Sequence, residues 1–385
     1  MLRRPVKKIL TKIRYNNFQT LNSVELDKSK LLSNFALFKR LNPEFGIIPV
    51  LKANAYGHGL EQVAEILNDA DCDYLAVDGY FEAAKIRDIT NHKILVLGYI
   101  KPANVKLLDT KKCTFVVQDI EGLEAFASLN KPVKVHLELN TGMNRLGLQS
   151  DELMPYLQTL IKHPSLILDG VMTHLADADN PYDDLYTIRQ TNLFDGYIKS
   201  ILDFGLNPKY IHIAQTAGST KTVSKYANSM RLGIGLYGIN PLEAGDKHFN
   251  ELSELQPVLE LKSTVIKTIE MKTGDKVSYN GIFTAPKTMK IGVLPLGYYE
   301  GIPRELSNKG LVTYGNQALP IVGRVCMNHT MIDLKSEKVK IGDTVIVISR
   351  QTKQLNSIVN ICRDNGLFSY SLLTGLSSSI RRVIV

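Results

Sequence analysis

The chain has 385 residues, of which 44% are hydrophobic and 22% are charged. This length allows two domains, one of them a barrel of about 200–250 residues, and the composition is that of an ordinary globular protein. No apolar run reaches the roughly 18–20 residues that a membrane-spanning helix needs. The four cysteines are scattered, which disfavours a disulfide framework or a structural zinc site and indicates a reducing, cytoplasmic compartment: Cys72, Cys113, Cys326 and Cys362.

The net charge of +8 is concentrated at the N-terminus. Six basic residues precede Glu25, the first acid: Arg3, Arg4, Lys7, Lys8, Lys12 and Arg14. Such a segment is either a solvated extension or an arm for nucleic acid or a membrane surface. We expect the former, an extension over residues 1–20 that packs with the C-terminal domain, with no nucleic-acid or membrane partner. It lacks the apolar stretch of a signal peptide.

In chain order, short apolar runs predict eight strands with amphipathic helices between them. The strands are Ile47–Leu51, Asp73–Val77, Ile94–Tyr99, Thr114–Val117, Val133–Leu139, Leu168–Thr173, Tyr210–Ala214 and Met230–Tyr237. The helices are Leu60–Ala70, Phe81–Ile89, Ile120–Leu129, Asp151–Lys162 and Asp184–Phe204. Eight alternating units predict an α/β fold, a (β/α)8 TIM-type barrel over residues 21–255. No G-x-G-x-x-G follows an early strand, which disfavours a dinucleotide site.

After about Leu255 the helical patterns disappear, and short strands separated by turns predict a mostly β domain over residues 256–385. The predicted strands are Val258–Ile269, Lys276–Tyr279, Lys290–Pro295, Leu311–Tyr314, Gln317–Val322, Met331–Asp333, Thr344–Ser349 and Ile380–Val385. The turns contain glycine at positions 281, 310, 315 and 342. The chain therefore divides into a barrel and a C-terminal β domain.

Lys52 lies where the first predicted strand ends and the turn Ala53–Gly59 begins. Burial there lowers the pKa of a lysine and allows its amine to form a Schiff base. The ordinary alternative is a solvated or salt-bridged lysine beside a strand. The other strand ends decide between the two.

The carboxyl ends of barrel strands meet at one mouth, and several polar residues follow them here. Thr216 begins a predicted helix, whose free N–H groups favour an anion, and Gly233-Ile234 allows a close backbone approach. Thr216 as a plain N-cap and Gly233 as a packing glycine remain alternatives. An amine and a phosphate cradle on one barrel suggest pyridoxal 5′-phosphate.

Arg231 lies in the last predicted barrel strand and narrows the chemistry. A carboxylate facing the pyridine nitrogen of this cofactor would keep that nitrogen protonated, whereas an arginine can only donate. The ring is then a weaker electron sink, which suits removal and return of a proton at Cα. Arg231 as a strand-end salt bridge remains the alternative.

With these motifs the chain resembles the alanine racemases, from about Leu21 to its C-terminus. The matching segments are Lys52-Ala-Asn-Ala-Tyr-Gly-His-Gly, Asn140-Thr-Gly-Met-Asn-Arg145-Leu-Gly, Thr173-His174, Arg231-Leu-Gly-Ile-Gly-Leu-Tyr-Gly, Ser278-Tyr279, Gly297-Tyr298, Gly323-Arg-Val-Cys-Met327 and Tyr370 with Arg382. The first and the arginine-glycine segment are highly specific in combination.

The resemblance implies an isomerase with two proton carriers, Lys52 as the Schiff-base lysine and Tyr279 from a partner subunit in a homodimer. It implies that the cofactor also contacts Tyr56, His174, Thr216, Arg231, Gly233, Ile234 and Tyr370. It implies that the substrate, alanine, meets Arg145, the Met327 backbone and Tyr298. The D-alanine formed supplies peptidoglycan. Racemisation by inversion needs a carrier on each face of the substrate, which agrees with two groups.

Three positions depart from the family. Glu138 stands where many members have a carbamylated lysine beside Arg145, and Asn140 and Asn328 stand where acids are common. We expect Glu138 to supply a carboxylate toward Arg145 without carbon dioxide. Two other functions fit the same barrel: a serine or broad-specificity racemase, and a non-catalytic pyridoxal-phosphate protein, which the β domain disfavours.

Overall fold

The computed structural model describes residues 18–222, 224–335 and 338–385, so the basic residues before position 15 lie outside the described residues. Two compact units make up the chain. The barrel unit contains Leu26–Leu259 with two short later segments, and the β unit contains Glu260–Ser349 and Lys353–Val383 with the described part of Met1–Glu25. Each unit is described by itself below.

The barrel unit is built on one parallel sheet of eight strands, as predicted. The strands are β2 (Gly46–Pro49), β3 (Tyr74–Val77), β4 (Lys93–Val96), β5 (Cys113–Val117), β6 (Val133–Glu138), β7 (Leu166–Met172), β8 (Tyr210–His212) and β9 (Ser229–Leu232). They pair in the order β2-β9-β8-β7-β6-β5-β4-β3. A parallel bridge between Val50 and Ala76 joins the two ends of this order and closes the barrel.

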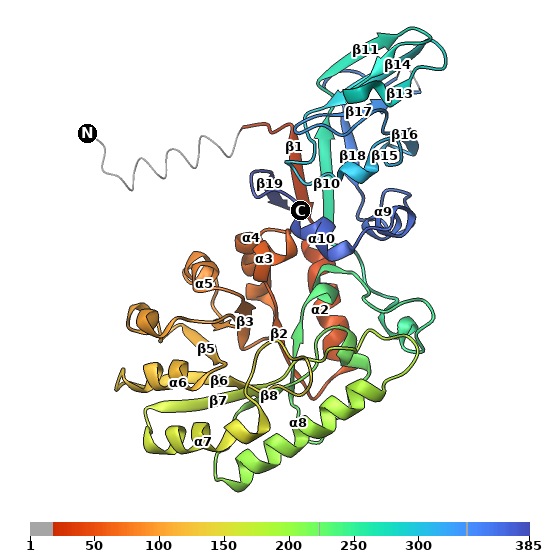
Figure 1. Cartoon of the computed structure of the whole chain (residues 1–385). Coiled ribbons are helices and arrows are strands. Elements are labelled where there is room, and N and C mark those ends of the chain that lie inside the picture. The colour runs from red at the N-terminus through yellow and green to blue at the C-terminus, as the bar shows by residue number, and fades with distance from the viewer. Residues whose placement is uncertain (1–17, 223, 336–337) are drawn as a thin grey trace, which may run out of the picture. The chain divides into compact units, whose positions relative to one another are not determined.

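Helices cover the outside of these strands (Figure 1). They are α2 (Lys28–Leu41), α4 (Leu60–Ile66), α5 (Tyr80–Ile86), α6 (Ile120–Ala127), α7 (Leu153–Lys162) and α8 (Leu185–Asp203), with the short 3₁₀ helix η2 (Pro102–Leu107) between β4 and β5. Helix α2 is absent from the prediction. Its buried face includes Asn34, whose amide donates to the carbonyls of Leu236 and Gln256, so a polar residue interrupts the apolar period.

The β unit holds three groups of strands. The largest sheet has the order β16-β15-β18-β10-β1-β19, and smaller sheets are β11-β14-β17 and β12-β13. The bounds are β1 (Asn22–Leu26), β10 (Leu259–Thr264), β11 (Lys267–Met271), β12 (Lys276–Val277), β13 (Phe283–Thr284), β14 (Met289–Leu294), β15 (Leu311–Tyr314), β16 (Gln317–Pro320), β17 (Thr330–Asp333), β18 (Thr344–Ile348) and β19 (Arg381–Ile384).

Two expectations for this part of the chain were wrong. Helical structure does not disappear, because α9 (Ile358–Asn365) and α10 (Ser369–Thr374) follow β18. The single strand predicted over Val258–Ile269 is two strands, β10 and β11, which belong to different sheets. The mostly β character of the unit is nevertheless confirmed.

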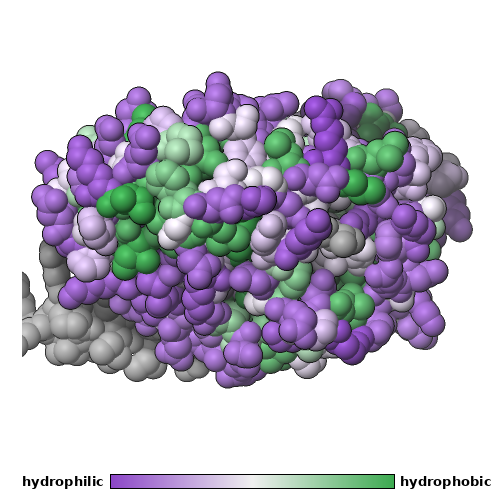
Figure 2. All heavy atoms as spheres, turned by 90° about the horizontal axis from the view of Figure 1, so that it is seen from below, coloured by the Kyte–Doolittle hydropathy of each residue, from purple (hydrophilic) through white to green (hydrophobic). Residues whose placement is uncertain are grey.

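Charged and polar side chains dominate the face of the molecule shown in Figure 2, with hydrophobic residues in smaller clusters between them. Within the described ranges, no helix is long and apolar enough to cross a membrane.

Candidate active site

The segment after β2 adopts a left-handed turn, α3 (Lys52–Tyr56). Four successive residues other than glycine have positive φ: Ala53 (54°), Asn54 (56°), Ala55 (53°) and Tyr56 (51°). This conformation costs about 1–2 kcal/mol per residue, and such strain gathers at functional sites. The Asn54 side chain stabilises the turn by accepting from the Leu60 N–H at 2.9 Å. The turn places Lys52 at its beginning and Tyr56 at its end.

Tyr56, Thr216 and Gly233 border one small space. A Cβ atom built on Gly233 would lie 2.9 Å from Tyr56 Oη and 3.9 Å from Thr216 Oγ1, so only glycine leaves room for a ligand atom there. Thr216 Oγ1 accepts from the Gly235 N–H at 3.1 Å. Burial raises the pKa of Tyr56 to about 12, although Arg231 lowers it, so the phenol remains a hydrogen-bond donor.

The helix predicted after Thr216 is a short 3₁₀ helix, η4 (Ala217–Thr220). One of its N–H groups is occupied, because Gly218 N–H donates to the Gln215 side chain at 3.0 Å. The predicted run of free helical N–H groups is therefore shorter than expected. The phosphate cradle depends on Tyr56, the Thr216 hydroxyl and the space at Gly233.

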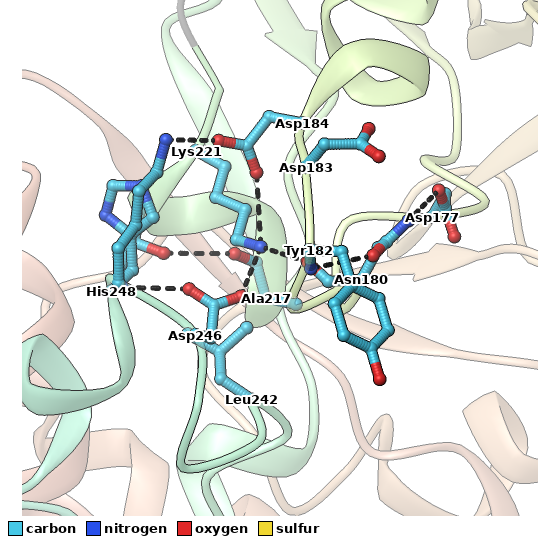
Figure 3. Close-up of polar contacts among 12 residues, drawn as sticks. Asp177, Asn180, Tyr182, Asp183, Asp184, Ala217, Lys221, Leu242, Asp246 and His248 are labelled. Atoms are coloured by element: carbon cyan, nitrogen blue, oxygen red, sulfur yellow. Dashed lines mark hydrogen bonds and ion pairs between the residues drawn. The ribbon is translucent and has the colours of Figure 1, made fainter.

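A buried ion cluster anchors the end of η4 (Figure 3). Lys221 Nζ donates to the Asn180 carbonyl at 2.8 Å, lies 3.2 Å from Asp184 Oδ1 and is bonded to Asp246 Oδ2. The Lys221 side chain is 1% exposed. An ammonium has three donors, and all three have acceptors here. Lys247 adds an exposed contact of 2.7 Å to Asp184. The cluster joins three connecting segments of the barrel unit, one of which contains Thr216.

Arg231, on β9, lies between two imidazoles. One guanidinium nitrogen, Nη1, contacts His212 Nδ1 at 2.9 Å, and the other, Nη2, contacts His174 Nδ1 at 3.2 Å. Nη2 also donates to the Thr173 carbonyl at 2.6 Å. Arg231 is 3% exposed, and burial lowers its pKa to about 10. The alternative of a strand-end salt bridge is wrong, because no carboxylate lies within 4.0 Å of Arg231 among the described residues.

The predicted residues at the mouth of the barrel shift one another's pKa values. Burial, together with the positive charges of Arg231, Arg145 and Lys52, lowers the pKa of His174 from 6.5 to about 3. Burial raises the pKa of Glu138, while the same three cations oppose that rise. The structure thus brings together the barrel residues that the sequence singled out. His174 is neutral at neutral pH.

Glu138 and Arg145 do not form an ion pair within 4.0 Å in the described part of the chain. The Glu138 carboxylate instead accepts from the Gln118 side chain at 3.4 Å. Arg145 is exposed on the loop between β6 and α7. Glu138 therefore acts on Arg145 through the electric field rather than through a hydrogen bond in this structure.

Asn140 organises the Arg145 loop. Its Oδ1 accepts from the N–H groups of Gly142 and Asn144, each at 3.1 Å, and its Nδ2 donates to Asn144 Oδ1 at 3.0 Å. An aspartate could accept the same two N–H groups but could not donate. This use of the amide gives a physical reason for asparagine at the position.

Four predicted site residues belong to the β unit. Tyr279 is 68% exposed and follows Ser278, whose φ of 63° is strained for a residue other than glycine. Tyr298 N–H donates to the Cys326 carbonyl at 3.0 Å, and none of the hydrogen bonds among described residues uses the Met327 N–H. Tyr370, on α10, stacks on Phe368 with ring centroids 4.8 Å apart. Asn328 donates to Glu300 at 2.8 Å.

The sequence analysis missed two residues that support this site, His212 and Lys221. His212 lies inside a predicted strand, two positions after Tyr210, and a polar residue in a strand buried on both faces is itself a signal. Lys221 has no comparable signal, because its burial depends on loops that meet only in the fold.

Comparisons with known proteins agree along almost the whole chain. The family model described as Alanine racemase, N-terminal domain, matches residues 26–241, and the one described as Alanine racemase, C-terminal domain, matches residues 258–384. The alanine racemase of Francisella tularensis subsp. novicida (strain U112) is 33% identical over 374 residues, which cover 95% of this chain and 100% of the relative. That of Staphylococcus saprophyticus is 31% identical over 367 residues, with 94% of each chain covered.

A solved structure agrees equally well. The crystal structure of alanine racemase from Bacillus anthracis with bound L-Ala-P superposes with a TM-score of 0.87 at 30% identity. The match covers 96% of this chain and 96% of that one. Both units of the chain thus have counterparts in one solved protein.

Proposed function

This chain belongs to the alanine racemase family, and on that premise we propose that it interconverts L- and D-alanine with Lys52 and Tyr279 as its proton carriers. The observation that carries the proposal is the joint placement of Lys52, the Tyr56–Gly233 cradle and a donor-only Arg231 in one barrel. D-alanine for peptidoglycan is the known role of the family.

The family depends on pyridoxal phosphate, and the barrel residues fit that group. Tyr56, Thr216 and the space at Gly233, with the neighbouring Ile234 backbone, would hold the phosphate. Arg231 would face the ring nitrogen as a donor, since a guanidinium accepts no proton. When bound, pyridoxal phosphate holds the substrate amine and accepts electron density from the breaking Cα–H bond.

Two residues of the chain then transfer the proton, one on each face of the substrate. Lys52 Nζ takes or returns the Cα proton on one face of the substrate, and Tyr279 Oη does so on the other. His174 accepts from Arg231 at Nδ1, so its remaining proton is on Nε2, where it can donate to the tyrosine. Arg145 and the Met327 N–H bind the substrate carboxylate, Tyr298 lines the entrance, and Tyr370 contacts the phosphate.

We infer a homodimer in which each site takes its tyrosine from the partner. The exposure of Tyr279 on a strained loop supports this, because strain persists where function requires it. A largely apolar hollow of about 590 Å³ adjoins Tyr279 in the β unit, lined by Met271, Val277 and Met331 among others. A second copy would cover it. The free thiols of all four cysteines fit a cytoplasmic location.

A racemisation assay with purified protein tests the proposal. Alanine, serine, lysine and arginine are compared, and alanine should be turned over best. Borohydride reduction of the cofactor-loaded protein, followed by peptide mapping, should place the label on Lys52. A label on another lysine would contradict the site, and faster turnover of serine would assign a different racemase.

Complementation tests the shared site separately. Lys52→Ala and Tyr279→Phe proteins are each inactive, but a mixed dimer has one intact site and should regain activity. The matched control is a mixture of Lys52→Ala with a Lys52→Ala, Tyr279→Phe double variant, in which no intact site can form. No recovery despite demonstrated subunit exchange would count against a tyrosine supplied in trans.

A further inference from the structure

The interior of the barrel contains a column of buried polar side chains. Barrels of this type are normally filled by layers of branched aliphatic residues. Here five buried polar residues each contact the next along the column: Arg231, His212, His136, Asp169 and Tyr74. Buried polar groups are costly unless they are satisfied, so such a column calls for an explanation. Only Arg231 has a role in the proposed function.

The contacts run in one line away from the site. Arg231 Nη1 donates to His212 Nδ1 at 2.9 Å, and His212 Nε2 lies 2.8 Å from His136 Nδ1. His136 Nε2 faces Asp169 Oδ2 at 3.8 Å, longer than a hydrogen bond. The carboxylate of Asp169 also accepts from Tyr74 at 2.6 Å and from Lys134 at 2.5 Å. Two imidazoles therefore separate a buried cation from a buried anion.

The chemistry of arginine assigns every proton in this line. A guanidinium only donates, so His212 Nδ1 must accept, and the proton of its neutral ring is then on Nε2. His136 Nδ1 must accept from that proton, which leaves the His136 proton on Nε2, facing Asp169. Burial lowers the pKa of both imidazoles, so both rings are neutral. All donors thus point from Arg231 toward Asp169.

The backbone is shaped to admit Asp169 and the His136 ring. In the pairing of β6 with β7, Val135 is opposite Leu168 while His136 is opposite Gly170, so Asp169 is an extra residue in a β-bulge. Bulges redirect side chains and are common next to active sites. A Cβ atom on Gly170 would lie 2.6 Å from the His136 ring, so that position excludes any larger residue. Bulge and glycine together make space for this contact.

Asp169 is also a carboxylate that can balance the buried charge of Arg231. Burial raises the Asp169 pKa, but the contacts with His136, Lys134 and Tyr74 outweigh it and hold the pKa well below its usual range. The carboxylate is therefore ionised. No described carboxylate forms an ion pair with Arg231 directly. Hydrogen bonds connect Arg231 to His212 and His212 to His136, and the last step is the 3.8 Å contact of His136 Nε2 with the negative charge of Asp169.

We propose that Asp169 is a positioning residue that acts through His136 and His212 to keep Arg231 oriented as a donor toward the ring nitrogen of the cofactor. This inference rests on the proposed function, which assigns Arg231 to that nitrogen. The charge of Asp169 and the fixed tautomers of both imidazoles are the means by which it acts.

The first test uses the wild-type chain. Protein labelled with ¹⁵N-histidine, loaded with pyridoxal phosphate, is studied by long-range ¹H–¹⁵N NMR. His136 and His212, assigned with single His→Gln variants, should both be neutral Nε2–H tautomers. An Nδ1–H tautomer or an imidazolium at either residue overturns the inference. This measurement does not require an Asp169 variant to fold.

The second test measures the cofactor. Asp169→Asn and a matched control, Tyr74→Phe, are loaded with pyridoxal phosphate carrying ¹⁵N in its ring. Tyr74 bonds the same carboxylate but lies outside the imidazole line. Asp169→Asn should move the ring ¹⁵N shift and weaken cofactor binding about tenfold, as loss of one charge in a buried network would. Tyr74→Phe should leave the shift unchanged. Equal shifts in both variants, or none in Asp169→Asn, refute the proposal.

A third variant separates this inference from the proposed function. Arg231→Lys should move the ring ¹⁵N shift if Arg231 faces that nitrogen. No response to Arg231→Lys contradicts the assignment of Arg231. A response to Arg231→Lys with none to Asp169→Asn leaves that assignment intact and removes only the role of Asp169.

Discussion

Replacing Lys221 with methionine should strongly destabilise the barrel unit. The side chain is 1% exposed and joins Asp184 to Asp246, which is also 1% exposed. Methionine has a similar length and fills the space without the charge. The variant therefore tests the ion cluster and not a cavity.

The expected loss in the free energy of unfolding is about 3–5 kcal/mol, the usual cost of removing one partner from a buried ion pair. Asp246 would keep only the His248 N–H at 2.8 Å, whereas Asp184 would keep Lys247 at 2.7 Å. The uncompensated charge is therefore mainly that of Asp246. For a unit of this size the loss corresponds to a melting temperature lower by about 10 °C.

The matched control is Lys247→Met. Lys247 contacts the same Asp184 carboxylate, but its side chain is 72% exposed. An exposed ion pair contributes about 0–1 kcal/mol, so this variant should be nearly as stable as the wild type. The comparison isolates burial, because both substitutions remove a lysine from one cluster.

The loss should depend on pH in a definite direction. Burial raises the pKa values of Asp184 and Asp246, but other contacts outweigh it and hold both pKa values below 3.8. At Asp184 these are Lys247 and Lys221, and at Asp246 they are Lys221 and His248. A lowered pKa contributes stability that is complete above the unfolded pKa and is lost as pH falls through the folded pKa. Without Lys221, burial raises the pKa of Asp246, and protonation of the Asp246 carboxylate then stabilises the folded variant. The difference in the free energy of unfolding between wild type and variant is therefore largest near pH 7 and becomes smaller toward about pH 4.

Urea unfolding of the cofactor-free proteins, followed by circular dichroism at several pH values, measures this gap. Hydrogen exchange then shows where the loss lies, and it should be concentrated at η4 and the adjoining loops, not in the β unit. Equal losses in Lys221→Met and Lys247→Met would refute the argument from burial. A gap that is constant from pH 4 to pH 7 would refute the argument from charge.

Four further variants test the site directly. Gly233→Ala should weaken pyridoxal-phosphate binding at least about tenfold in equilibrium dialysis, with unchanged unfolding, because its Cβ would lie 2.9 Å from Tyr56 Oη. Glu138→Gln should raise the KM for alanine more than it lowers kcat, because the field at Arg145 serves ground state and transition state alike, and activity of the wild type should not depend on dissolved carbon dioxide. Asn140→Asp should also raise KM, since the loop loses its donor to Asn144, whereas Asn140→Ala should raise it further by removing the acceptor as well.

The barrel and most of its mouth were predictable from the sequence for one physical reason. Strands buried on both faces appear as continuous apolar runs, and the carboxyl ends of parallel strands meet at one edge. Lys52, His174 and Thr216 each follow such a run and Arg231 lies in the last one, so their proximity could be expected from the sequence. The relation between Glu138 and Arg145 could not, because Arg145 lies on a loop whose path depends on Asn140.

The left-handed turn after Lys52 could not be predicted from the sequence either. Its residues other than glycine include two alanines, which have no preference for positive φ. The conformation is imposed by tertiary contacts, such as the 3.3 Å bond from the Asn54 N–H to Glu82. A local pattern cannot report a contact between segments 28 residues apart.

The polar column is visible in the sequence as an alternating pattern, but this pattern can be interpreted only when the fold is known. Along β6, Lys134, His136 and Glu138 alternate with Val133, Val135 and Leu137. In an open sheet this alternation indicates one face in water. In a closed parallel barrel helices cover the outside, so the apolar set must face the helices and the polar set the interior. The same six residues therefore predict a polar barrel axis once eight units have been counted. These residues cannot predict that Asp169 is the partner of His136. Asp169 faces His136 only because of the β-bulge in β7, and a shift of one residue in β7 would turn Asp169 to the other side of the sheet.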